Sequence, residues 1–149
     1  MAELYRTEFA GAPSCDTIVI HCSDPRYQGH FQEFLRGGLG LANYGLVAVP
    51  GGPQFLTLVD YLPKFSWAGW RWVKFLADFT KARRAVLIAH DDCRWYVDGG
   101  FWQRRGNLRE RQVRDLEEVR AQIAQRFPGI VVDLYYARLD GDHAVFEAL

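Results

Sequence analysis

The sequence has no excess of charge of either sign. Its 18 lysine and arginine residues are balanced by 18 aspartate and glutamate residues, so the formal net charge at pH 7 is zero. A protein that binds nucleic acid or an anionic membrane through its overall field needs a basic excess. We therefore expect neither of these partners, and a small neutral substrate fits the charge balance better.

Long apolar runs are also missing. A membrane-spanning helix needs about 20 predominantly apolar residues, and even the aromatic-rich stretch 67–79 is interrupted by Arg71, Lys74 and Asp78. Residues 1–9 are interspersed with charged side chains and lack the apolar stretch of a secretory signal. We therefore expect no membrane association and a cytoplasmic location.

Cysteine is scarce, with three residues in the chain. An odd number of cysteines without an export signal argues against a disulfide framework and for reduced thiols. Cys15 precedes the first predicted strand, and we interpret it as an incidental free thiol. The role of Cys22 and Cys93 depends on where the fold places them.

What the chain does contain is enough apolar sequence for one core. Its 149 residues, 49% of them hydrophobic, suffice for a single domain over residues 1–149 and are too few for two. A turn at 140–142 followed by a short strand at 144–146 predicts a hairpin-like C-terminal edge. Apolar runs predict strands at 17–20, 46–49, 85–89 and 130–136, and 17–20 has the uninterrupted pattern of a strand buried on both faces of a parallel sheet.

Two helical patterns lie between the later strands. One is predicted to begin at Ser66 as an N-cap, and its large apolar residues surround the helix, which suggests burial against another subunit. The other begins near Asn107, where Glu110 completes a capping box, and carries an apolar stripe over 116–123. Strands alternating with helices predict an α/β fold with a mainly parallel central sheet flanked by helices.

Cys22 and His90 each end a predicted buried strand. Ligand sites in open parallel sheets lie beyond the carboxyl ends of the strands, so the sheet itself can bring these two residues together. Cys93 follows His90 by three positions in the same loop. Two thiolates and one imidazole leave a tetrahedral position open and suit Zn²⁺. We therefore predict a zinc site; the alternative is that the three side chains merely pack.

Two motifs surround these residues. Residues 22–26 have the pattern Cys-x-Asp-x-Arg, and residues 90–93 have the pattern His-x-x-Cys after a buried strand. They resemble the motifs of the β-class carbonic anhydrases in their order along the chain, in the strands that precede them and in their wide separation. The resemblance covers residues 17–96 best. It implies the fold of that family, a zinc cofactor held by the three residues named above, and a homodimer or higher homo-oligomer.

The resemblance also implies a lyase that hydrates carbon dioxide reversibly to bicarbonate through a zinc-bound hydroxide. Asp24 follows a predicted zinc ligand by two positions, close enough to accept a hydrogen bond from metal-bound water. Arg26 can hold that carboxylate bidentately and keep it ionised, so we predict Asp24 and Arg26 as the catalytic pair. If Arg26 released it, Asp24 could itself ligate zinc, and the resemblance implies both states.

The chain differs from the family beside the predicted metal. Arg94 stands where the family usually has glycine, bulky Trp95 and Tyr96 follow it, and residues 49–53 form an apolar Val-Pro-Gly-Gly-Pro loop in place of a polar one. The glutamine that the family has before its first strand is also missing. Two other functions therefore remain open: hydrolysis of carbonyl sulfide or carbon disulfide, and a zinc-binding protein without hydratase activity.

Other conspicuous residues have structural interpretations beside functional ones. His21 is expected to pack on the face opposite Cys22, because side chains alternate along a strand. Asp91 and Asp92 either cap a helix or hydrogen-bond to the zinc ligands. An arginine cluster could hold an anion, although interleaved glutamates favour a solvated helix start; its members are Arg104, Arg105, Arg109, Arg111 and Arg114.

The predicted ligand set determines how activity should depend on pH. In a site of three imidazoles, zinc lowers the pKa of its bound water to about 7. Two thiolates neutralise much of the metal's charge and blunt that effect. We therefore expect carbon dioxide hydration by the zinc-loaded protein to rise toward alkaline pH in stopped-flow measurements. A flat rate from mildly acidic to alkaline pH would contradict this expectation.

Overall fold

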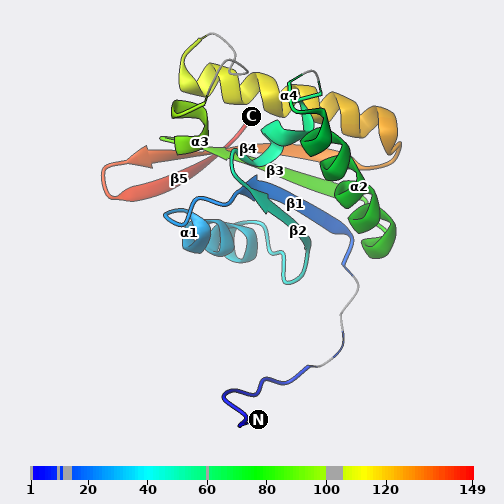
Figure 1. Cartoon of the computed structure of the whole chain (residues 1–149). Coiled ribbons are helices and arrows are strands. Elements are labelled where there is room, and N and C mark those ends of the chain that lie inside the picture. Colours follow the sequence, from blue (N-terminus) through cyan, green and yellow to red (C-terminus); the bar gives the residue numbers. More distant parts are fainter. Residues whose placement is uncertain (1, 10, 12–14, 60, 100–105) are drawn as a thin grey trace.

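The computed structural model describes residues 2–9, 11, 15–59, 61–99 and 106–149, which form a five-stranded sheet with helices on both sides (Figure 1). The strands, in chain order, are β1 (Thr17–Cys22), β2 (Gly45–Val49), β3 (Arg84–His90), β4 (Val131–Asp140) and β5 (His143–Ala148). Their order across the sheet is β2-β1-β3-β4-β5, and only the β4–β5 pair is antiparallel. The predicted α/β fold with its hairpin-like edge is confirmed.

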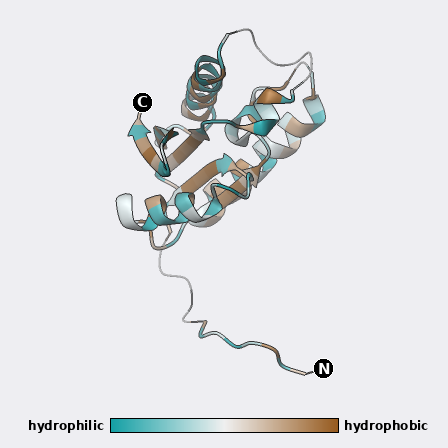
Figure 2. Ribbon diagram, turned by 90° about the vertical axis from the view of Figure 1, so that its left-hand side faces the viewer, coloured by the Kyte–Doolittle hydropathy of each residue, from teal (hydrophilic) through white to brown (hydrophobic). Residues whose placement is uncertain are grey.

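The helices form two layers around the sheet. On one side are α1 (Gln28–Glu33) and the π-helical η1 (Phe34–Gly38); on the other are the 3₁₀-helical η2 (Gly52–Leu56), α2 (Pro63–Thr80) and α4 (Leu108–Arg126). The short α3 (Arg94–Val97) follows the end of β3. Figure 2 shows the apolar strands enclosed between these layers.

Strand β1 illustrates how one strand serves both layers. Ile18 and Ile20 belong to the core under α2 and α4, whereas Val19 belongs to the core under α1. His21 is buried on the α1 side, with its ring centroid 4.5 Å from that of Phe31, as the alternation of side chains predicted. The strand is therefore buried on both faces, as expected for a central parallel strand.

Helix α4 begins and packs as predicted. Asn107 is its N-cap, and the side-chain oxygen accepts a hydrogen bond from the backbone N–H of Glu110 at 2.9 Å. Leu116, Val119 and Ile123 are each at most 1% exposed. The N-cap bond of Asn107 and the apolar stripe therefore fix both the start of the helix and the face that covers the sheet.

The prediction that Ser66 is the N-cap of α2 is wrong. The helix begins at Pro63, because proline has a fixed φ that suits the first helical position and lacks an N–H that would have no partner there. Ser66 lies within the first turns and is buried, and its hydroxyl donates to the backbone carbonyl of Leu56 at 3.1 Å. The serine thus ties α2 to η2 instead of capping the helix.

In the single chain, α2 is buried on one side only. Trp70 and Val73 face the core, but a row of aromatic side chains is at least half exposed: Trp67, Trp72, Phe75 and Phe79. We call these four residues the aromatic row. None of the described helices combines the length and the apolarity that a membrane crossing requires.

Candidate metal centre

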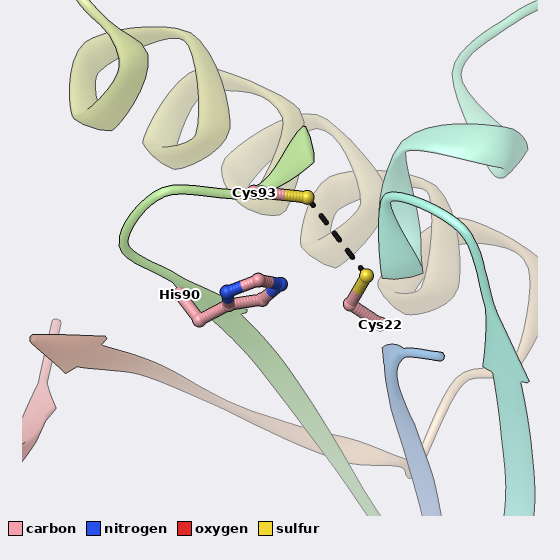
Figure 3. A group of neighbouring side chains, drawn as sticks. All are labelled: Cys22, His90 and Cys93. Atoms are coloured by element: carbon pink, nitrogen blue, oxygen red, sulfur yellow. Dashed lines mark hydrogen bonds between the residues drawn. The ribbon is translucent and has the colours of Figure 1, made fainter. Parts of the chain in front are cut away.

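Three potential metal ligands converge at the carboxyl ends of β1 and β3. Cys22 ends β1, His90 ends β3, and Cys93 lies in the loop that leads to α3. Their ligating atoms all lie within 4.8 Å of one another, and the two sulfur atoms are 3.8 Å apart. All three residues are buried, and Figure 3 shows their side chains turned toward one another. This group can hold a metal ion.

The imidazole of His90 is oriented for coordination. Its Nδ1 lies 2.8 Å from the backbone oxygen of Asp91 and donates to it, so Nε2 carries the free lone pair. Nε2 is buried and has no hydrogen-bond partner among the described residues. Buried polar atoms normally have a hydrogen-bond partner. Two thiols and an imidazole nitrogen are a set of ligands that suits zinc. The residues therefore fit the predicted metal.

The two thiols share their protons unequally. The pKa of Cys22 is held well below its usual range, first because Cys93 donates a hydrogen bond to its sulfur. The pKa of Cys93 is raised, because the hydrogen bond to Cys22 and burial both favour its protonated form. Cys22 therefore loses its proton more readily than Cys93, and metal binding would require both as thiolates.

Two glycines let the loop after β2 approach the ligands. Gly51 and Gly52 have φ of +76° and +56°, in the left-handed region that favours glycine. A Cβ on Gly52 would lie 2.9 Å from the backbone nitrogen of Cys22, and one on Gly51 would lie 2.2 Å from Cδ1 of Trp95. The backbone N–H of Gly51 also donates to the sulfur of Cys22 at 3.3 Å. The Pro-Gly-Gly-Pro loop therefore supports the first ligand directly.

Asp24 and Arg26 form an ion pair beside the metal ligands. Nε and Nη2 of Arg26 donate to the two carboxylate oxygens of Asp24 at 3.1 and 2.7 Å. The side chain of Asp24 is only 8% exposed, and the guanidinium holds the pKa of this carboxyl below its usual range. Both residues line a cavity of about 320 Å³ that reaches Cys22. The carboxylate faces Arg26 and does not join the three-ligand group.

Arg94, Trp95 and Pro50 border the same cavity, which places the residues that differ from the family beside the ligands. Trp95 and Pro50 also border a second cavity of about 470 Å³ against α2. Apart from Lys64, its walls are apolar; they include Phe55, Leu58, Phe65 and Trp72. An apolar cavity therefore adjoins the one that reaches Cys22.

A buried polar network behind Cys93 was not predicted from the sequence. Asp115 of α4 is 2% exposed, and its Oδ2 accepts from the hydroxyl of Tyr96 at 2.6 Å and from Nε2 of Gln54 at 3.1 Å. Nε1 of Trp95 donates to the side-chain oxygen of Gln54 at 2.7 Å. The network anchors Trp95 and Tyr96, the second and third residues after Cys93. The sequence held one indication of this network: Asp115 adjoins the apolar stripe of α4, where a buried carboxylate needs hydrogen-bond partners.

Asp91 and Asp92 do not cap a helix, because α3 begins at Arg94 with Cys93 as its N-cap. The carboxylate of Asp91 accepts from the hydroxyl of Tyr136 at 2.9 Å and from the backbone N–H of Leu139 at 2.8 Å. These bonds fix the peptide whose carbonyl orients His90. Asp91 therefore supports the imidazole through the backbone, in the way that groups behind metal ligands commonly do.

The arginine cluster is only partly covered by the structure. Arg104 and Arg105 lie outside the described residues. Arg109 donates to Glu147 at 2.7 Å, and the guanidinium of Arg111 lies 5.9 Å from the ring centroid of Tyr96. These two arginines therefore make contacts within the chain.

Asp115→Asn tests the network behind Cys93. The amide has a single acceptor oxygen and turns N–H groups toward donors, so we expect the free energy of unfolding in urea to fall by about 1–3 kcal/mol. Asp78→Asn is the matched control: Asp78 pairs with Lys74 on the exposed side of α2, and its loss should change stability by less than about 0.5 kcal/mol. Equal stability of the two variants would show that the network does not anchor this region.

No family model matches the chain, and no curated protein matches it in sequence. Solved structures do match. A structure of tetrameric β-carbonic anhydrases from the filamentous ascomycete Sordaria macrospora has a TM-score of 0.55 and 15% identity, over 94% of this chain and 83% of that chain. A β-carbonic anhydrase of the fungal pathogen Aspergillus fumigatus has a TM-score of 0.48 and 13% identity, over 91% and 76%. The first likeness shows that this chain has the fold of a β-carbonic anhydrase.

Proposed function

We propose that this protein is a zinc-dependent lyase that hydrates carbon dioxide reversibly to bicarbonate. The observation that carries the proposal is the convergence of Cys22, His90 and Cys93, with ligating atoms within 4.8 Å of one another. The shared fold of a β-carbonic anhydrase supports it. In this proposal the three residues hold Zn²⁺, which when bound supplies a Lewis acid that lowers the pKa of a coordinated water.

Groups around the ligands prepare them for the metal. The carbonyl of Asp91 accepts the Nδ1 proton of His90 and thereby keeps the Nε2 lone pair on the side of the thiols. The N–H of Gly51 donates to the sulfur of Cys22 and stabilises its thiolate form. The ligand atoms are thus oriented before an ion arrives, which reduces the reorganisation that binding requires.

Asp24 and Arg26 are the proposed catalytic pair. Arg26 keeps the carboxylate of Asp24 ionised, and an ionised carboxylate can only accept hydrogen bonds. In the cavity beside Cys22, Asp24 would accept the hydrogen of the attacking oxygen and direct that oxygen's lone pair toward the substrate carbon. Pro50 and Trp95 form an apolar part of the wall of this cavity, against which an uncharged electrophile could lie.

A second candidate function is hydrolysis of carbonyl sulfide or carbon disulfide. The apolar cavity that shares Pro50 and Trp95 with the site favours it, because these sulfur analogues are less well hydrated than carbon dioxide. The same ligands and the same catalytic pair would serve this reaction. The two functions therefore differ in the electrophile and not in the metal chemistry.

Metal analysis tests the proposed centre. Protein loaded with zinc and then dialysed should contain about one zinc per chain, as four-coordinate sites with two thiolates bind zinc tightly. Cys22→Ser and Cys93→Ser should each lose the metal, whereas Cys15→Ser, which removes a thiol outside the group, should keep it. Zinc-free protein, or equal zinc contents in all three variants, would overturn the proposal.

Stopped-flow kinetics on the zinc-loaded protein tests the reaction. Asp24→Asn should lower carbon dioxide hydration by about 100-fold or more, because a neutral amide cannot replace the ionised acceptor; Asp78→Asn should leave the rate unchanged. A zinc-loaded protein that is inactive toward carbon dioxide but hydrolyses carbonyl sulfide would select the second candidate. Inactivity toward both would leave a zinc-binding protein without hydratase activity.

We also propose that the chain forms a homo-oligomer, with the aromatic row as an interface. Trp72 belongs both to this row and to the wall of the apolar cavity that adjoins the candidate site. Several large apolar side chains exposed on one helix commonly mark an interface. The Sordaria proteins with this fold are tetrameric, which supports a second copy as the occupant.

Phe75→Glu tests this interface. Phe75 is 64% exposed, so a charge there is tolerated in the free chain but opposes burial against a second copy. In sedimentation velocity we expect the unchanged protein to be oligomeric and Phe75→Glu to dissociate at concentrations where the unchanged protein does not. Val131→Glu introduces the same charge at an exposed site outside the row and should stay oligomeric. A monomeric unchanged protein would contradict the proposal.

A further inference from the structure

Arg26 binds a second aspartate, on the loop that carries His90 and Cys93. Its Nη1 donates to Oδ2 of Asp92 at 2.7 Å, and its Nη2 donates to the backbone oxygen of Asp92 at 2.8 Å. With the two bonds to Asp24, the guanidinium donates four hydrogen bonds. A guanidinium has five N–H groups, so the two aspartates do not compete for the same hydrogen.

Asp92 adopts an unusual backbone conformation at this position. Its φ is +49°, in the left-handed region that few non-glycine residues adopt, although aspartate tolerates it better than most. In this conformation the residue offers its carboxylate and its carbonyl to one guanidinium. Strained residues persist where their surroundings hold them and gather at functional sites, and this one immediately precedes Cys93.

The contacts of Asp92 limit the freedom of Arg26. The side chain of Arg26 is 48% exposed, as is that of Asp92, whereas that of Asp24 is 8% exposed. An exposed arginine that holds one carboxylate alone retains much rotamer freedom, and such pairs are individually weak. Two further bonds from the other loop restrict the guanidinium to the orientation that engages both oxygens of Asp24.

We propose that Asp92 is a positioning residue that acts through Arg26 to keep the carboxylate of Asp24 away from the metal position. This role rests on the proposed metal centre and adds a residue to it. Without Asp92, Arg26 releases Asp24 more often, and Asp24 follows Cys22 by only two positions. The freed carboxylate then competes with exogenous ligands for the fourth coordination position.

Anion binding to the cobalt(II)-loaded protein measures this competition without any turnover. The visible spectrum of cobalt(II) reports its ligands, and titration with azide reports access to the fourth position. We expect Asp92→Asn and Asp92→Gly each to weaken azide binding by about three- to tenfold. Asp92→Gly relieves the backbone strain and keeps the carbonyl, so the test does not depend on a variant that fails to fold. Asp78→Asn should bind azide like the unchanged protein.

The direction of the expected change in azide affinity distinguishes the release of Asp24 from a simple electrostatic effect of the lost charge. Removing a negative charge near the site would by itself strengthen the binding of an anion, whereas release of Asp24 weakens it. A double variant tests the route: in the background of Asp24→Asn the carboxylate at position 24 no longer competes, so adding Asp92→Asn should no longer weaken azide binding.

Two results would overturn this role while leaving the metal centre intact. One is unchanged azide affinity in both Asp92 variants with cobalt bound; the other is a loss of affinity that persists when Asp24 is already asparagine. A protein that binds no cobalt at all would overturn the metal centre and this role together. Binding of about one cobalt per chain therefore distinguishes failure of the inference from failure of the proposed function.

Discussion

The parallel pairing of β1 with β3 is the constraint on which the candidate site depends. The register places His21 beside Ile88, so the ends of both strands reach the same edge of the sheet, where Cys22 and His90 can share one ion. A slip of one residue would turn every side chain of a strand to its other face. The buried apolar residues on both faces of β1 and β3 oppose such a slip, and the stability of the core thereby fixes the positions of the ligands.

Around this sheet edge, each ligand is supported by a different part of the fold. The glycine loop after β2 reaches the sulfur of Cys22, the peptide of Asp91 orients His90, and the network of Asp115 on α4 holds the residues after Cys93. Arg26 joins the loop of the first ligand to that of the other two. The site therefore draws on the loops after β1, β2 and β3 and on α4, so mutations away from the ligands should also affect metal binding.

The sequence predicted the elements that depend on local pattern. Apolar runs located the strands, and the spacing of Cys22, His90 and Cys93 predicted a group that the fold does bring together. The predicted start of α2 was wrong because Pro63, which suits the first helical position, begins the helix one turn before Ser66. The pairing of Gln54 with Asp115 could not be predicted, since 61 positions separate them and only the packed fold makes them neighbours. The left-handed backbone of Asp92 likewise follows from its contacts with Arg26 and not from a local pattern.

The central claim is that two sulfur atoms and one imidazole nitrogen of this chain bind a common zinc ion. X-ray absorption at the zinc edge of the loaded protein tests it most directly, because the scattering separates sulfur from lighter atoms. The account predicts two sulfur neighbours at about 2.3 Å and one imidazole nitrogen at about 2.0–2.1 Å, with one further light atom in the fourth position. A coordination shell without sulfur, or one that keeps both sulfur atoms in Cys22→Ser, would contradict it.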